Sequence, residues 1–169
     1  KSYSVFIFLV VVLLALDVFA ATVKASSCSG SDVQAAINAS ASGDLVIVPA
    51  GNCTWNTTVS VPNSKKLRII GEGIGATIIS TSSVNTAFDL TQSGSRLSGC
   101  SFSKCQIIVD GVGWRIHHCR FAESGSGVVV QGNTSPAVAP SGLIDNCSFL
   151  NSRVVVLGTK ANFIDGSQQ

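Results

Sequence analysis

A histidine and two carboxylates recur at equivalent positions of a short pattern in the C-terminal half of the chain. His117, Asp145 and Asp165 each follow an isoleucine, and Ser98 takes the same place after a leucine. If the fold stacks these positions, Asp145 and Asp165 lie about 5 Å apart and shift each other's pKa, as general acid–base catalysis requires. The competing interpretation is a solvated polar face on which His and Asp pair beside a turn.

The segments that must position these residues form a repeat. One strand type recurs as AFDLTQ, QIIVDG, VVVQG and VVVLG, and a second recurs as RLSGCSF, RIHHCRF, LIDNCSF and FIDG. The second type starts at residues 96, 115, 143 and 163, and the longest interval holds the insertion Asn133–Ser141. Strands joined only by short turns cannot make helix-linked parallel pairs, so we expect them to stack coil on coil as a parallel β-helix.

Three columns of the aligned repeat support this stacking. Aliphatic residues that we expect to point inward are Leu97, Ile116, Ile144 and Ile164. An aromatic column that we expect inside is Phe102, Phe121 and Phe149. A column of types that tolerate positive φ, which predicts one tight turn per coil, is Gly99, His118, Asn146 and Gly166.

The N-terminal segment has the layout of a secretory signal peptide. Twelve apolar residues, Val5–Leu16, follow a lone Lys1, and small residues end the segment at Ala20 and Ala25. The run is shorter than the ~20 residues of a spanning helix, although a membrane anchor or a buried helix is the alternative. We therefore predict a signal peptide over residues 1–25, cleaved after Ala20 or Ala25, and one extracellular domain over 26–169.

The start of that domain predicts one short helix followed by strands. Ser31 and Gln34 fit a capping box with Ser31 as N-cap, and apolar residues then recur at helical spacing. Leu45–Val48 is typical of a buried strand. The glycine-rich stretch Gly71–Ala76 is followed by another strand-like segment rather than a helix, so we interpret it as a turn and not as a nucleotide site.

Composition excludes some functions. The 169 residues carry a formal net charge of +2 and 12% charged residues, which is too neutral for a nucleic-acid groove. The 46% hydrophobic content excludes a disordered chain. Because residue 1 is not Met and the chain ends within a patterned segment, we interpret it as a fragment open at both ends that holds the N-terminal part of the domain.

The stretch SCSGSDVQAAINASASGDLVIVPAGNCTW, the strands LRIIGEG and ATIIS, and the repeated I-x-N-C-x-F coil resemble the pectate-lyase-like superfamily of secreted right-handed parallel β-helix proteins. The resemblance covers residues 27–169. It implies an all-β solenoid with an N-terminal helix that closes the open end and protects its strand edges. The superfamily holds lyases, polygalacturonases, epimerases, phage tailspikes and proteins without known activity.

With the helix as a cap, we predict a disulfide between Cys28 and Cys53, which flank the helix and its following strand. Closing this loop would contribute roughly 3 kcal/mol in the chain-entropy model; the alternative is two free or differently paired thiols. We interpret Cys100, Cys119 and Cys147 as small buried hydrophobic side chains rather than metal ligands. Cys105 could reach Cys100, and the sequence leaves the pairing of these four cysteines open. Possible glycosylation sites are Asn38, Asn52, Asn56, Asn133 and Asn146.

The resemblance does not transfer a catalytic set. The sheet that usually bears it has the outward residues Ile108, Val129 and Val155, so either another segment covers this face or catalysis lies elsewhere. A lyase would add Ca²⁺, for which Asp89 and Asp110 are the candidate ligands, with Asp110 also a candidate catalytic residue. Basic residues near strand starts, interpreted as solvated charges, are Arg96, Arg115 and Arg153.

The leading hypothesis is a secreted, monomeric, carbohydrate-active protein that binds or cleaves an acidic polysaccharide, with no membrane attachment after signal cleavage. Lyase is the first reaction expected and glycoside hydrolase the second, both by analogy of fold. The rival hypothesis is a non-catalytic extracellular adhesion or structural solenoid, which the apolar outward sheet favours.

Overall fold

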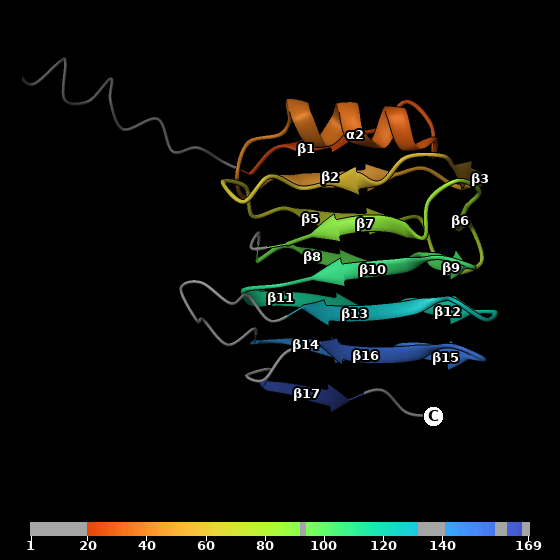
Figure 1. Cartoon of the computed structure of the whole chain (residues 1–169). Coiled ribbons are helices and arrows are strands. Elements are labelled where there is room, and N and C mark those ends of the chain that lie inside the picture. The colour runs from red at the N-terminus through yellow and green to blue at the C-terminus, as the bar shows by residue number, and fades with distance from the viewer. Residues whose placement is uncertain (1–19, 92–93, 132–140, 158–161, 167–169) are drawn as a thin grey trace, which may run out of the picture.

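The computed structural model describes residues 20–91, 94–131, 141–157 and 162–166. Over these residues the chain winds into a parallel β-solenoid with three sheets and one helix (Figure 1). The predicted signal segment, up to residue 19, and residues 133–140 of the predicted insertion lie outside the described residues. Within the described part, no helix has the length and apolar character needed to cross a membrane.

Each coil contributes one strand to each of three sheets, which we call A, B and C. Sheet A contains β1 Thr22–Lys24, β2 Leu45–Val48, β5 Arg68–Gly71, β8 Arg96–Ser98, β11 Val112–His117, β14 Ser141–Asp145 and β17 Asn162–Gly166. Sheet B contains β3 Gly51–Trp55, β6 Thr77–Thr81, β9 Ser101–Ser103, β12 Arg120–Ala122 and β15 Ser148–Leu150. Sheet C contains β4 Val59–Ser60, β7 Thr86–Leu90, β10 Gln106–Val109, β13 Gly127–Gln131 and β16 Arg153–Leu157.

The aromatic column predicted from the repeat forms the interior. The rings of Phe102 and Phe121 stack with centroids 5.3 Å apart, and those of Phe121 and Phe149 stack at 4.9 Å. Phe88 of sheet C and Trp55 add edge-on ring contacts that extend the aromatic interior toward the N-terminus. Residues about one coil apart in sequence are therefore vertical neighbours, which confirms the predicted stacking.

The aliphatic column is confirmed over three coils and wrong in the last. Leu97, Ile116 and Ile144 are register partners and have no exposed surface. In β17, however, Ile164 pairs with Leu143 rather than with Ile144. The last strand is thus displaced by one residue from the sequence alignment.

The turn between sheets A and B uses positive φ as predicted. Gly99, His118 and Asn146 have φ of 70°, 50° and 51°. A second column of left-handed residues, between sheets B and C, was not predicted: Lys104, Glu123 and Asn151 have φ of 56°, 74° and 53°. The residue types of this second column share no turn preference, so the sequence gives little sign of it.

The helix α2, Gly30–Ala39, covers the N-terminal end of the stack (Figure 1). The predicted capping box is wrong in position, because the N-cap is Ser29, whose hydroxyl accepts from the Asp32 backbone N–H. Gln34 instead reaches across to strand β4, donating to the Ser60 carbonyl and accepting from its N–H. The side chain that suggested a cap therefore fastens the helix to the first coil.

The cysteines divide as expected. Cys28 and Cys53 form a disulfide with a Cα–Cα distance of 5.9 Å, which confirms the predicted pair. The side chains of four further cysteines are buried and form no disulfide in the described part of the chain: Cys100, Cys105, Cys119 and Cys147. Burial raises the pKa of the Cys100 and Cys105 thiols to about 12, so both are protonated and unreactive at neutral pH.

Candidate functional site

Three arginines form a ladder on the outward face of sheet A. Arg68 of β5 pairs in register with Arg96 of β8, which pairs with Arg115 of β11. Side chains alternate along a strand, and the next residues, Ile69, Leu97 and Ile116, are fully buried. The arginines therefore point outward, with backbones one strand spacing, about 4.8 Å, apart.

A surface pocket of about 280 Å³ lies over this ladder. Its polar lining comes from two outward columns that lie two residues apart along the strands. One column is Arg68, Arg96 and Arg115, and the other is Ser98 and His117. Ile69 and Ile70 complete the floor. Several guanidinium groups around one concave surface form a site for anions, because each can bind a carboxylate through two parallel hydrogen bonds.

One end of the ladder is occupied by a carboxylate of the chain itself. Arg115 donates from Nε to Asp145 Oδ1 at 2.8 Å and from a terminal nitrogen to Asp145 Oδ2 at 2.6 Å. This pairing lowers the pKa of Asp145 and raises that of Arg115. The interpretation of Arg115 as a solvated charge is therefore wrong, and Asp145 is ionised and poorly suited to act as an acid.

The two predicted catalytic aspartates are not register partners of each other. Asp145 is the register partner of Gly166, and Asp165 is the partner of Ile144. The direct vertical pairing expected from the sequence is therefore absent from the backbone register, and a catalytic role of either residue stays a prediction.

His117 takes the predicted place between two coils. Its register partners are Ser98 on one side and Asp145 on the other. Its Nδ1 lies 2.9 Å from Nδ1 of His118, so one ring donates and the other accepts. Burial, and then the charge of Arg115, lower the pKa of His117, which leaves a neutral imidazole beside the arginines at pH 7.

Asp89 and Asp110, the candidate Ca²⁺ ligands, are not register partners in sheet C. Asp89 is level with Ile108 in sheet C and accepts hydrogen bonds from the backbone and hydroxyl of Thr91. Asp110 lies two residues further along and accepts from the Gly111 N–H at 2.5 Å. Over the described residues, no group of three or more His, Cys, Asp or Glu could hold a metal ion.

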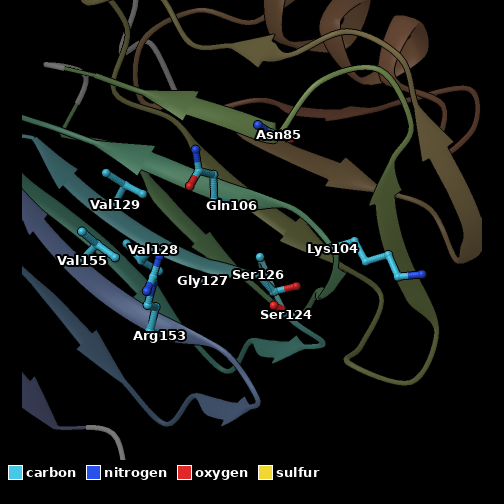
Figure 2. Close-up of a pocket in the computed structure, with 11 residues that line it drawn as sticks. Asn85, Lys104, Gln106, Ser124, Ser126, Gly127, Val128, Val129, Arg153 and Val155 are labelled. Atoms are coloured by element: carbon cyan, nitrogen blue, oxygen red, sulfur yellow. The ribbon is translucent and has the colours of Figure 1, made fainter.

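The outward face of sheet C carries the predicted aliphatic column. Ile108, Val129 and Val155 are register partners. A pocket of about 330 Å³ lies at the start of these strands (Figure 2). Figure 2 shows Arg153 beside the valines, whereas the Lys104 side chain points away from them, toward its ion pair with Glu123. This pocket therefore combines Arg153 with polar side chains such as Asn85 and Gln106 and with the valines of the column.

Four of the five predicted glycosylation sites are accessible in the structure. Exposed side chains belong to Asn38, Asn52, Asn56 and Asn146. Asn133 lies outside the described residues. Exposure of these asparagines is compatible with modification, which stays a prediction.

The arginine ladder was missed from the sequence, although a signal for it exists. KLRIIGEG, RLSGCSF and RIHHCRF each place an arginine directly before the inward aliphatic residue. The repeat recognised in the sequence begins at AFDLTQ, which follows Arg68, so it contains only Arg96 and Arg115 of this column. The preceding segment KLRIIGEG supplies the third arginine.

Comparison with known proteins identifies no family. No family model matches the chain, and no curated protein matches it. Among solved structures, the chain is similar to a protein of Geobacillus virus E2, ORF18, with a TM-score of 0.48 and 19% sequence identity. The similarity covers 86% of this chain and 40% of the viral chain, so this chain spans less than half of its length.

Proposed function

We propose that this protein is an extracellular β-solenoid that binds an acidic polysaccharide along the arginine ladder of sheet A. The observation that carries the proposal is the register of Arg68, Arg96 and Arg115, which repeats a positive charge at the strand spacing. A polyuronate repeats one carboxylate per sugar along an extended chain. A ladder of guanidinium groups matches such a periodic anion better than it matches a single compact one.

Two features of the sequence support an extracellular carbohydrate ligand. The N-terminal segment has the pattern of a signal peptide, and the first coils resemble those of the pectate-lyase-like superfamily. A solenoid also offers a straight surface along which a polymer can lie. These features favour an acidic polysaccharide over other polyanions.

The binding experiment compares two triple variants with the same change of charge. Arg68, Arg96 and Arg115 are replaced by glutamine in the first, and Lys104, Arg120 and Arg153 in the control. We expect the first to lose at least about 100-fold in affinity for oligogalacturonate or oligoalginate, because two charge-assisted contacts are lost and the carboxylate of Asp145 is left in the pocket without its counterion. The control should stay within about threefold. Equal losses in both variants would reject the ladder as the binding site.

Cleavage of the same polymer is the second candidate function, and His117 is the observation that favours it. A neutral imidazole beside arginines could remove the proton next to a uronate carboxylate whose charge the arginines stabilise. Elimination would then leave an unsaturated sugar that absorbs in the ultraviolet. The test follows this absorbance with and without Ca²⁺, for the wild type and for His117→Gln. Binding without product would support the non-catalytic adhesion or structural role instead.

A further inference from the structure

The first described strand is fastened at its start by a buried carboxylate. The Ala21 N–H donates to Asp44 Oδ1 at 2.8 Å, and the Ala41 N–H donates to Oδ2 at 2.7 Å. Asp44 is only 4% exposed and forms none of the ion pairs found within the described residues. The nitrogen of residue 21 therefore touches a buried negative charge that lacks a cationic partner there.

The strand that follows belongs to the solenoid. Thr22, Val23 and Lys24 pair in parallel with β2, and the Leu45 N–H donates to the Ala21 carbonyl at 2.8 Å. At the other end of β1, Ala25 is buried and its N–H donates to the Ile47 carbonyl at 3.0 Å. Loss of this strand would expose the edge of β2 beneath the helix.

These contacts distinguish the two cleavage positions that the sequence allows. Cleavage after Ala25 would remove β1, together with the ion pair of 2.7 Å between Lys24 and Glu72. Cleavage after Ala20 would keep every one of these contacts. It also satisfies the small-residue pattern, with Ala20 before the cut and Val18 two residues earlier.

We propose that the chain is cleaved between Ala20 and Ala21 and that the α-ammonium group released at Ala21 forms an ion pair with Asp44. Hydrolysis adds water across this peptide bond, so Ala20 leaves with the carboxylate and Ala21 keeps the amine. The ordinary pKa of an α-amino group is about 8, so the amine takes up a proton at neutral pH. The proposal rests on the secretion that the proposed function includes.

The ion pair would make the processed chain more stable than the precursor. A hydrogen bond between charged groups is about twice as strong as one from a neutral amide, and the buried Asp44 gains the counterion it lacks. Removal of the signal segment would therefore stabilise the pairing of β1 with β2 at the N-terminal end of the solenoid.

The first test determines the N-terminus of the secreted protein by mass spectrometry. We expect Ala21. A mature chain that begins at Ser26, or one that retains the segment before Ala21, overturns the proposal. Affinity for oligouronates is measured on the same sample, so that a failure of binding with the expected N-terminus counts against the proposed function alone.

The second test measures whether the new amine and Asp44 are coupled. The chain that begins at Ala21 is compared with one extended by Gly-Ser, which keeps the hydrogen bond from residue 21 but moves the α-ammonium group two residues away from Asp44. We expect the extension to lower the folding equilibrium constant about tenfold. In Asp44→Asn the extension should have no effect, whereas in the control Asp32→Asn its effect should persist. An equal effect of the extension in all three backgrounds overturns the ion pair.

Discussion

Sheets A and C have the same backbone architecture, because each is formed by parallel strands from successive coils of the solenoid. On sheet A the column reads Arg68, Arg96 and Arg115, while on sheet C it reads Ile108, Val129 and Val155. The interior behind both faces is equally apolar. In this solenoid the backbone thus sets where side chains lie, and the type of residue in each outward column sets what the face can bind.

Removing the interior common to both faces has the largest expected effect. Phe121→Ala deletes a fully buried ring that stacks between Phe102 and Phe149, and should lower the free energy of unfolding by about 3–5 kcal/mol. Phe149→Ala should cost clearly less, because Phe149 is only partly buried. Denaturant unfolding measures both, and equal losses would contradict the stacked interior.

Moving the arginine column tests whether the residue types alone distinguish the faces. Ile108→Arg, Val129→Arg and Val155→Arg are introduced together into the variant that lacks Arg68, Arg96 and Arg115. If the backbone only sets positions, this transplant should restore at least about 100-fold of the lost affinity for oligouronates. A folded transplant, judged by its circular dichroism, that does not bind would show that sheet A contributes more than its column of charges.

The fold could be predicted from the sequence because its columns repeat. Phe102, Phe121 and Phe149 occupy the same position of the repeat in three coils. Such a recurrence predicts stacking without any knowledge of the function. The predicted helix cap is wrong by two residues, since Ser29 and Ser31 are both good N-caps, and Gln34, which suggested the capping box, instead bonds to Ser60 of the next strand. Local preference did not contain that tertiary contact.

The candidate site was harder to predict, because it depends on the register of single residues. The column of His117 and Asp145 was found, yet one displaced residue in β17 separates Asp165 from it. The ion pair between Arg115 and Asp145 joins different columns of neighbouring strands, at a diagonal that an alignment by columns does not display. The alternation of apolar and polar residues predicts which side chains are buried, but it does not predict which outward charge pairs with which.

The ion pair at the end of the ladder gives a smaller effect. Asp145→Asn frees Arg115 and removes a negative charge from the pocket, so affinity for oligouronates should rise about fivefold. Glu123→Gln removes a carboxylate that pairs with Lys104 away from the ladder, and should change affinity less than twofold. Titration of labelled oligouronate measures both. Weaker binding by the Asp145 variant would mean that this pair organises the site.

The smallest effect is the dependence on pH. The pKa of His117 is lowered, so the ring is neutral at pH 7 and gains its charge only as the pH falls below its ordinary value of about 6.5. Protonation adds a cation beside the ladder, and affinity for oligouronates should therefore rise about threefold from pH 7 to pH 5. The chain has two histidines, so His117→Gln should abolish this rise and His118→Gln should keep it. The opposite pattern would assign the dependence to His118.

The central claim is tested most directly by removing one charge from each face and measuring the dissociation constant for an oligouronate at fixed ionic strength. Arg96→Gln removes the middle of the ladder on sheet A, and Arg153→Gln removes the arginine of the pocket on sheet C. The predicted result is an increase of about tenfold for the first and less than twofold for the second. Equal increases would contradict the account, because the charge of the whole molecule would then matter and its arrangement on sheet A would not.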